Sequence, residues 1–150
     1  MSKLTKISSI LITAFGVLMI VAAICSWCFI SQQVSREQIT TPQDASIPNA
    51  PVQGPLTLKA QSDIIREHAL DMTDGQTYAE MPRQIEQIDA NGNKTMVDNT
   101  ARNTWITVTA LTTALNLGLL SYGLSALVGA LGIIFVLIGL TFYQMNKKKQ

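Results

Sequence analysis

The apolar residues of this 150-residue chain fall into two long uncharged blocks. The first block runs from Ile7 to Ser35 and the second from Asn103 to Asn146, and neither contains Asp, Glu, Lys or Arg. A helix of about 20 apolar residues spans a hydrocarbon core of about 30 Å. The remaining segment is too small and polar to bury two such helices in a soluble core. The pattern therefore predicts two transmembrane helices, over residues 7–30 and 118–143.

The second block is longer than one crossing needs. One helix over Thr104–Tyr143 would be roughly 60 Å long, about twice the hydrocarbon thickness. We expect residues 104–117 to extend this helix outward and to pack against the outer segment, with Trp105 on the external domain or at the membrane interface. A third span, splitting near Tyr122-Gly123, would leave a lysine-bearing tail outside, against the charge rule. Two spans are favoured.

The segment between the blocks, residues 31–103, is polar and rich in proline at its start. The prolines and their polar neighbours predict an extended, irregular linker over Gln32–Gly54. Apolar positions at helical spacing then predict a helix over about Leu58–Thr73, with Gly75 as its C-terminal stop. The predicted fold is an all-α membrane protein: an antiparallel transmembrane helix pair, a small, mostly helical extracytoplasmic segment, and a long second helix that projects outward.

Two shorter patterns follow the predicted outer helix. Thr77-Tyr-Ala-Glu80 has the capping-box form, and Pro82 limits any helix there to about a turn. Asn91-Gly92 lies between short apolar stretches, which permits a small hairpin within Gln84–Asp98.

The charges of the chain are distributed asymmetrically. All ten acidic residues lie between Glu37 and Asp98, whereas the two ends carry only lysine, at positions 3, 6 and 147–149. Cytoplasmic flanks are enriched in Lys and Arg, so both tails, residues 1–6 and 144–150, are expected in the cytoplasm. The first apolar run also exceeds the usual 7–15 residues of a signal peptide, which favours an uncleaved anchor. The expected partners are membrane lipid and either a second copy or another membrane protein, and nothing suggests nucleic acid.

Small residues recur every seven positions in both predicted spans. This spacing keeps one stripe facing a partner helix, and small side chains let two backbones approach closely. Counted from the helix centres in antiparallel sense, Gly16 falls level with Gly132, Ser9 with Gly139, and Ala23 with Ser125. The same face could instead serve a second copy or another protein. The full set of predicted packing residues is Ser9, Gly16, Ala23, Gly118, Ser125, Gly129, Gly132 and Gly139.

The two cysteines, Cys25 and Cys28, form a C-x-x-C pair near the C-terminal end of the first span. The helix dipole there works against a reactive thiolate, and zinc would need further ligands. Ordinary apolar packing is the better interpretation.

Candidate chemistry in the outer segment is weak. Asp89-Ala-Asn91-Gly-Asn93 begins like a calcium loop, but the sixth and twelfth positions are Lys94 and Thr100, so a polar turn is favoured. His68 lies near Glu67 and Asp71, but no nucleophile is placed around it by a known pattern. We predict no catalytic, metal or cofactor-binding residue. His68, Tyr78 and Trp105 are instead expected to contribute to an interaction surface.

The middle of the chain resembles a family of small actinobacterial two-helix membrane proteins of unknown function. The matching stretches are Glu37-Gln-Ile39, Asp44-Ala45, Gly54-Pro55, Ala60-Gln-Ser-Asp-Ile-Ile65, His68-Ala-Leu70, Thr73-Asp-Gly75 and Thr77-Tyr-Ala-Glu80. Members often carry the label of an aromatic ring-opening dioxygenase, which needs iron held by several histidines and a carboxylate. One histidine does not supply that set, and Arg83–Lys94 departs from the family pattern. The resemblance implies this topology and a bacterial plasma membrane, but no activity.

These observations favour a non-enzymatic interaction or accessory subunit of the bacterial cell envelope. The alternative is an oligomeric transport or pore component, although the spans carry only Ser, Thr and Asn116 as polar groups. An extracytoplasmic enzyme using His68, Glu67 and Asp71 comes third.

Overall fold

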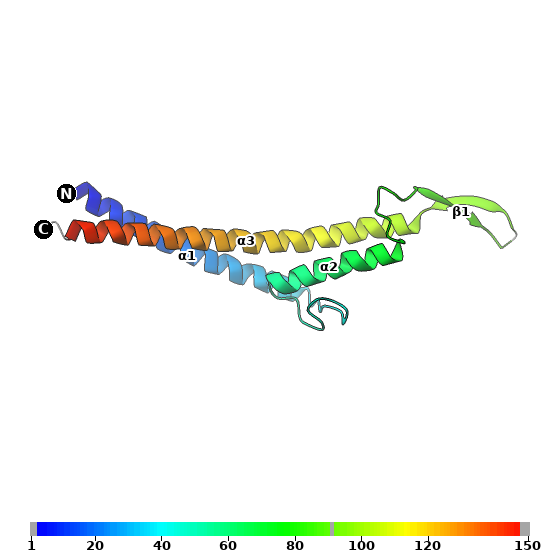
Figure 1. The fold of residues 1–150 in the computed structure, drawn as a ribbon, viewed down its shortest axis with the longest axis horizontal. Coiled ribbons are helices and arrows are strands. Elements are labelled where there is room, and N and C mark those ends of the chain that lie inside the picture. Colours follow the sequence, from blue (N-terminus) through cyan, green and yellow to red (C-terminus); the bar gives the residue numbers. More distant parts are fainter. Residues whose placement is uncertain (1–2, 91, 148–150) are drawn as a thin grey trace. The chain divides into compact units, whose positions relative to one another are not determined.

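Three helices and one hairpin account for most of the described residues, and the chain is mostly helical (Figure 1). The structure is a computed structural model that describes residues 3–90 and 92–147. The elements in chain order are α1 (Lys3–Arg36), α2 (Pro55–Met72), β1 (Gln84–Ile88), β2 (Lys94–Asp98) and α3 (Thr100–Lys147). The all-α expectation is therefore wrong at the hairpin, which the sequence only permitted. The predicted orientation signal at Lys148 and Lys149 lies outside the described residues.

The chain divides into two compact units. The helix-pair unit comprises α1, the residue Glu37 that follows it, and the part of α3 from Leu120 onward. The central unit comprises residues 38–119, which hold α2, the hairpin and the first part of α3.

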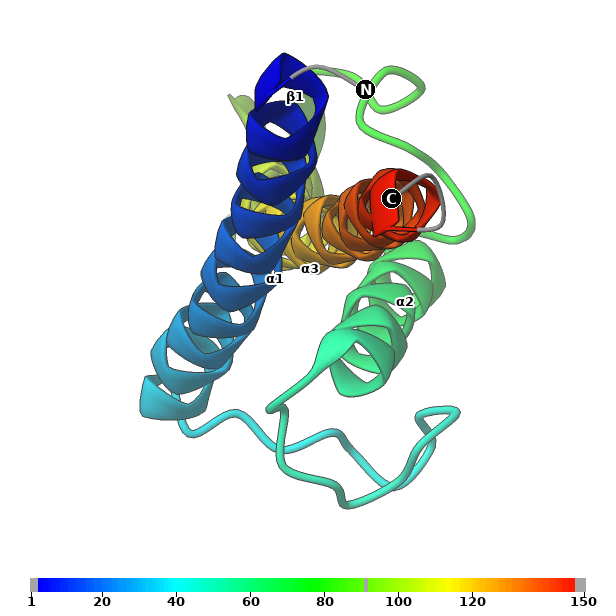
Figure 2. The ribbon, with the colours of Figure 1, turned by 90° about the vertical axis from the view of Figure 1, so that its left-hand side faces the viewer.

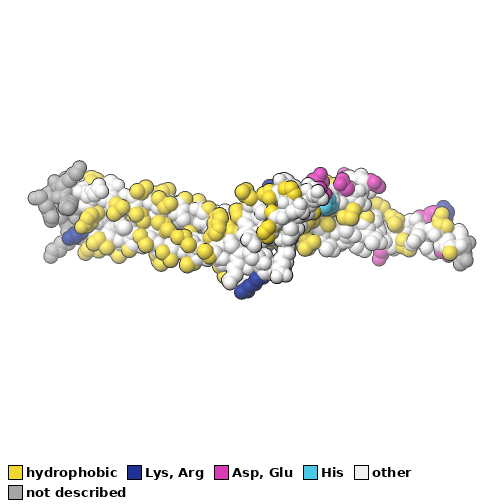
Figure 3. Space-filling view, turned by 90° about the horizontal axis from the view of Figure 1, so that it is seen from below, with side chains coloured by type: hydrophobic (Ala, Val, Ile, Leu, Met, Phe, Trp, Pro, Cys, Tyr) yellow, Lys and Arg dark blue, Asp and Glu magenta, His cyan; other side chains and the backbone are white. Residues whose placement is uncertain are grey.

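In the helix-pair unit, α1 and α3 pack side by side (Figure 2). Both helices are long and apolar enough to cross a membrane, and only 17% of the most apolar window of each is buried. A core helix of a soluble protein would be mostly buried. In Figure 3, hydrophobic side chains cover the visible face of this helix pair. α1 and α3 are therefore candidate membrane-spanning helices, and α1 continues past the predicted span 7–30 at both ends.

The core of the central unit forms where α2 and the first part of α3 meet. Ala69, Met81 and Trp105 are all at most 6% exposed and pack together. The guanidinium of Arg66 lies 6.0 Å from the centroid of the Trp105 ring. The prediction that the start of the second long helix packs against the outer segment is confirmed by these contacts. Trp105 is buried, however, so the expectation that it contributes to an exposed interaction surface is wrong.

Helix α2 begins where the sequence supplies its own cap. Gly54 is extended, with φ −158° and ψ 177°, and Pro55 opens the first turn, where a missing N–H costs nothing. The hydroxyl oxygen of Thr57 accepts hydrogen bonds from the N–H groups of Gln53 (3.1 Å) and Gly54 (3.2 Å). At the other end, Gly75 takes φ +75° and its N–H donates to the Leu70 carbonyl at 2.8 Å.

The loop between α1 and α2 is folded around a buried threonine, and its expected extended form is wrong. Residues 32–36 belong to α1. Beyond them, the Thr41 side chain is 1% exposed, and its hydroxyl oxygen accepts the Ala50 N–H at 2.9 Å. The Thr41 N–H donates to the Ala50 carbonyl at 2.9 Å, while Thr40 forms an isolated bridge with Pro51. Proline limits regular structure here, but these cross-loop bonds close the loop on itself.

The hairpin pairs β1 with β2 in antiparallel register, from Gln84 opposite Asp98 to Ile88 opposite Lys94. Gly92 takes φ +83°, a conformation that side chains rarely adopt, and its N–H donates to the Asp89 carbonyl at 3.0 Å. The turn residue Asn91, which the hairpin prediction used, lies outside the described residues. All but one of the ten strand residues are exposed, and Val97 is half-buried.

Candidate interaction site

The backbones of α1 and α3 come into close contact at two glycines, Gly16 and Gly132. A Cβ added to Gly16 would lie 2.6 Å from the Gly132 carbonyl oxygen and 2.7 Å from the Val136 nitrogen. A Cβ on Gly132 would lie 2.8 Å from the Gly16 carbonyl oxygen. Real Cβ contacts are longer, so both positions require glycine while the backbones stay this close. The two residues that the sequence placed level with each other lie in direct contact.

Two further levels of the stripe lie on either side of this contact. Toward the cytoplasmic end expected from the sequence, Gly139 lies against the backbone of Thr13 and the Ser9 carbonyl, and Ser9 is 1% exposed. On the opposite side, a Cβ at Gly129 would lie 3.3 Å from the Ala23 Cβ. Ala23 therefore faces Gly129, which lies one helical turn along α3 from Ser125, the residue expected at the level of Ala23. Ala23 and Ser125 also line the same hollow.

Hydrogen bonds join the two helices beyond the glycine contacts. The Ser26 and Ser125 hydroxyls lie 2.8 Å apart, and the Ser31 and Tyr122 hydroxyls 2.7 Å apart. The Trp27 and Tyr122 rings pack edge to face with centroids 4.7 Å apart. Sequence reasoning missed these bonds, because counting from the helix centres placed Ser125 level with Ala23 and not with Ser26.

Gly118 is the one predicted packing residue that lies elsewhere. It belongs to the central unit, where a Cβ at this position would lie 3.3 Å from the Leu58 side chain of α2. The prediction that Gly118 continues the α1-facing stripe is therefore wrong. Seven-residue spacing identifies the face of a helix but not which neighbour covers it.

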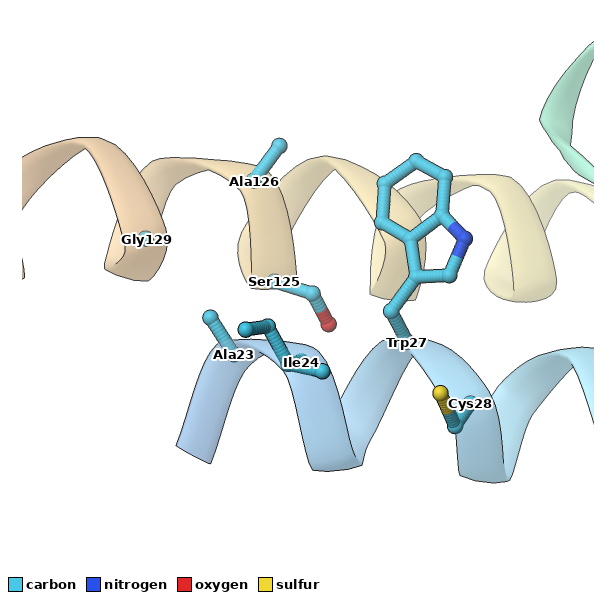
Figure 4. Close-up of a pocket in the computed structure, with 7 residues that line it drawn as sticks. All are labelled: Ala23, Ile24, Trp27, Cys28, Ser125, Ala126 and Gly129. Carbon is cyan, nitrogen blue, oxygen red and sulfur yellow. The ribbon is translucent and has the colours of Figure 1, made fainter. Parts of the chain in front are cut away.

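A shallow hollow of about 270 Å³ lies between the paired helices (Figure 4). Trp27 reaches from α1 toward α3 at one end of the hollow, and the Ser125 hydroxyl points into the space between the helices. Cys28 lines the hollow, and both Cys25 and Cys28 are free and exposed. The cysteines are thus on the surface of α1.

In the central unit, His68 on α2 holds the loop that precedes the helix. Its Nε2 donates to the Asp44 carboxylate at 2.6 Å, and both side chains are substantially exposed. This hydrogen bond, followed by smaller effects, lowers the pKa of the Asp44 carboxyl below its usual value. A histidine bonded to a carboxylate across the surface holds the loop of Asp44 against α2.

Tyr78 lies under a cation. The Arg102 guanidinium is 4.0 Å from the Tyr78 ring centroid, close enough for cation–π attraction. Tyr78 is 39% exposed and lines a second hollow, of about 520 Å³, with Ile106, Thr109, Ala110 and Thr113 of α3. Of the three expected interaction residues, His68 and Tyr78 therefore reach the surface.

The single turn that carries Tyr78 forms one half of the capping box that the sequence predicts, the bond from the Thr77 N–H to the Glu80 side chain. The Glu80 carboxylate accepts hydrogen bonds from the Thr77 N–H at 2.7 Å and the Thr77 hydroxyl at 2.9 Å. These bonds lower the pKa of the Glu80 carboxyl. The turn ends at Met81, whose N–H donates to the Thr77 carbonyl.

One face of the hairpin is an exposed apolar surface that sequence reasoning did not single out. Ile88 and Met96 are 63% and 61% exposed and lie diagonally across the two strands. Glu86 and Lys94, on the same face by strand alternation, form an ion pair at 2.6 Å. The sequence shows apolar residues at the even-numbered positions 88 and 96. Only the strand register shows that these two residues share a face of the hairpin.

A scan of protein-family models and searches of curated proteins and of solved structures find no match to this chain. Within residues 3–90 and 92–147, no three His, Cys, Asp or Glu side chains gather closely enough to hold a metal ion.

Replacing Gly132 with Ala should push α1 and α3 apart, because the new Cβ meets the Gly16 carbonyl and backbone must move. We expect a loss of about 1–3 kcal/mol in helix-pair stability. The measurement is disulfide formation between Ser26→Cys and Ser125→Cys in a Cys25→Ala/Cys28→Ala chain. The matched control is Gly123→Ala, since a Cβ at Gly123 meets nothing within 4 Å. Equal disulfide yields in both variants would contradict the glycine contact.

Removing the imidazole in His68→Ala should return the pKa of Asp44 toward its usual, higher value. Because the folded pKa is lowered, the pair stabilises the docked loop above the ordinary Asp pKa, and this is lost as pH falls through the lowered value. Side-chain carboxyl NMR during an acid titration measures the shift. Asp71→Asn, on the same helix, should leave Asp44 unchanged, and an unchanged Asp44 in His68→Ala would refute the pair.

Proposed function

We propose that this chain is a membrane-anchored interaction subunit of the bacterial cell envelope. The helix-pair unit is the anchor, and the central unit is displayed on the outer side of the plasma membrane. The observation that carries the proposal is the sorting of surface chemistry between the units. Large apolar side chains cover the paired helices, whereas the acidic residues all belong to the segment from Glu37 to Asp98 (Figure 3).

Lipid is the solvent that suits the surface of the helix-pair unit. Its exposed side chains include Leu11, Phe15 and Leu18 on α1, each more than half exposed. In water such a surface would drive aggregation, because contiguous apolar patches of this extent mark interaction or membrane sites. In a bilayer the same surface costs nothing, and the helical backbone satisfies its own hydrogen bonds.

The charge pattern supports the orientation. Lysines lie at both ends of the chain, before the first span and after the second. The residues between the two spans carry a net negative charge. The positive-inside rule then puts residues 1–6 and 144–150 in the cytoplasm and residues 31–103 outside. In this orientation residues 104–117 of α3 extend the second span outward into the central unit. The family resemblance supplies the bacterial plasma membrane.

The hairpin supports a docking role for the central unit. Two-stranded hairpins are marginal alone in water, yet this one exposes Ile88 and Met96 on a face held by the Glu86–Lys94 ion pair. A partner that covers this face would bury apolar surface and order the strands. The geometry around His68 and Asp44 favours loop anchoring over catalysis, because the imidazole is already bonded to a surface carboxylate.

The transport alternative has less support from the same contacts. Hydroxyls within the spans bond to one another or to their own helix, as in Ser26 with Ser125 and Thr13 with the Ser9 carbonyl. A pore-lining group would instead face water or a permeating ion. The Ser26–Ser125 pair joins the two helices, and the Thr13 bond stays within α1.

The orientation can be tested with two matched glutamine positions. In a Cys25→Ala/Cys28→Ala chain, Gln76→Cys lies in the central unit and Gln144→Cys near the end of α3, and both positions are exposed. A membrane-impermeant maleimide applied to intact cells should label Gln76→Cys and reach Gln144→Cys only after lysis. The reverse pattern would overturn the orientation, and labelling of both in sealed cells would overturn the anchor.

The docking role can be tested on the hairpin. A photoreactive amino acid at Ile88 should crosslink a partner protein in living cells, whereas the same group at Gln87 should not, because adjacent strand residues point to opposite faces. The adduct is detected as a discrete band and identified by peptide mass. If the Ile88 variant purified from irradiated cells carried no adduct, the interaction role would be rejected.

A further inference from the structure

Trp27 lies on the last part of α1, and its ring reaches across to α3 (Figure 4). The ring packs edge to face on Tyr122, yet Trp27 remains 40% exposed. The indole nitrogen is on the side of the ring away from Gly129 (Figure 4). None of the described residues accepts a hydrogen bond from this N–H. The fold therefore leaves one polar donor without a partner beside an apolar surface.

The exposed surface of α1 changes from apolar to polar just beyond Trp27. Large exposed side chains before it include Leu11, Leu18 and Ile24. After Ile30, the exposed residues of α1 are Gln32, Gln33 and Arg36. Apolar side chains suit lipid and polar ones suit water. Trp27 is therefore close to the level at which the surroundings of the helix change.

The distance from this level to the other end of the helix pair matches a bilayer. Trp27 follows Lys6 by 21 residues on α1, and Tyr143 follows Tyr122 by 21 residues on α3. At about 1.5 Å per residue, each segment is roughly 32 Å long, close to the hydrocarbon thickness of about 30 Å. Lys6 and Tyr143 are exposed, so their polar tips can reach the opposite interface.

The glycine contact shows that these two segments cover the same depth. Gly16 is ten residues from one end of its segment and eleven from the other, and the same holds for Gly132. Because the two glycine backbones are in contact, the midpoints of the segments coincide. The ends of the segments were chosen from aromatic residues and a lysine, whereas the contact depends on backbone packing. Two independent features therefore give one set of boundaries.

We propose that Trp27 binds the outer headgroup layer of the membrane, where its indole N–H donates to phospholipid ester or phosphate oxygens. Trp is enriched at this level because its ring is apolar and its N–H is polar. In hydrocarbon an N–H without an acceptor costs free energy, and lipid oxygens at the boundary supply one. Residue numbers on α3 fall toward the outer end, so an N–H directed away from Gly129 is directed outward. The inference rests on the membrane anchor and orientation proposed above.

The two native cysteines test this depth. Both are free and exposed on α1, with Cys25 below the level of Trp27 and Cys28 just above it. Maleimides react with the thiolate, which forms in water and not in hydrocarbon. In sealed cells an impermeant maleimide should label Cys25→Ala, which retains Cys28, several-fold faster than Cys28→Ala, which retains Cys25. Equal rates would overturn the proposed boundary.

The role of the N–H is tested in the Cys25→Ala chain. Trp27→Phe keeps a ring for Tyr122 but removes the donor, so the outer end of α1 should move deeper and Cys28 should react several-fold more slowly. Phe29→Leu is the matched control, because Phe29 flanks Cys28 on the other side, is 60% exposed and carries no donor. An unchanged rate in Trp27→Phe, or an equal decrease in Phe29→Leu, would reject the hydrogen bond to lipid.

A second measurement needs no cysteine. In liposomes, the emission of Trp27 is the difference between the wild-type chain and Trp27→Phe. Bromine atoms on lipid chains near the ester groups should quench this emission several-fold more than bromine atoms near the chain ends. Stronger quenching by the deep bromines would overturn the depth of Trp27, while correct labelling of Gln76→Cys and Gln144→Cys would leave the anchor intact. Quenching by neither lipid would remove the anchor itself.

Discussion

The contact between the Gly16 and Gly132 backbones sets the geometry of the helix-pair unit. A single added carbon at either position would fall closer than 3 Å to the opposing backbone, so the distance between the helices is fixed by the absence of side chains. Short interhelical bonds depend on that distance. The Ser26 and Ser125 hydroxyls are short groups that meet at 2.8 Å only because the backbones are already close. The same closeness lets Tyr122 reach Ser31 while its ring packs on Trp27. The glycines thus act by letting Ser26, Ser125 and Tyr122 reach their hydrogen-bond partners on the other helix.

The central unit differs from the helix-pair unit, because it carries most of the charged residues of the chain and its core is small. Ala69, Met81 and Trp105 form one cluster of this core, and the other buried hydrophobic residues of the unit are Ala45, Val52, Leu58, Ala60 and Ile64. Polar groups stabilise the rest: Thr41 closes the loop before α2, Asn99 caps α3 through the Ala101 N–H at 3.1 Å, and the Asn99 side chain also donates to the Pro82 carbonyl at 3.0 Å. These side chains occupy the turns where backbone groups would otherwise lack partners. These hydrogen bonds order the loops and turns that connect the helices and strands of the unit.

Periodicity predicted the parts of this molecule that depend on one helix face. Seven-residue spacing identified Gly16, Gly132 and Gly139, because a tight helix pair needs small residues at that period wherever it occurs. The same spacing misassigned Gly118, because Leu58 of α2 covers it, and no local pattern reveals a neighbour supplied from elsewhere in the chain. The loop around Thr41 was missed for a similar reason: proline predicts the lack of helix or strand, but closure depends on a threonine meeting Ala50 nine residues away. Trp105 was placed in the correct unit, but its side chain is buried in the core and was expected on an interaction surface.

Residue size varies along the side of α3 that meets α1, although the helix has no charged residue between Asn103 and Asn146. Opposite Gly132 and Gly139 the helix α1 presents backbone atoms, and a single added carbon would fall within 3 Å of them. Opposite Ser125 and Tyr122 the same helix presents side chains, which bond to the two hydroxyls and pack on the Tyr122 ring. A close helix pair needs glycine only where the two backbones meet. The size of each α3 residue therefore matches what α1 presents at that level.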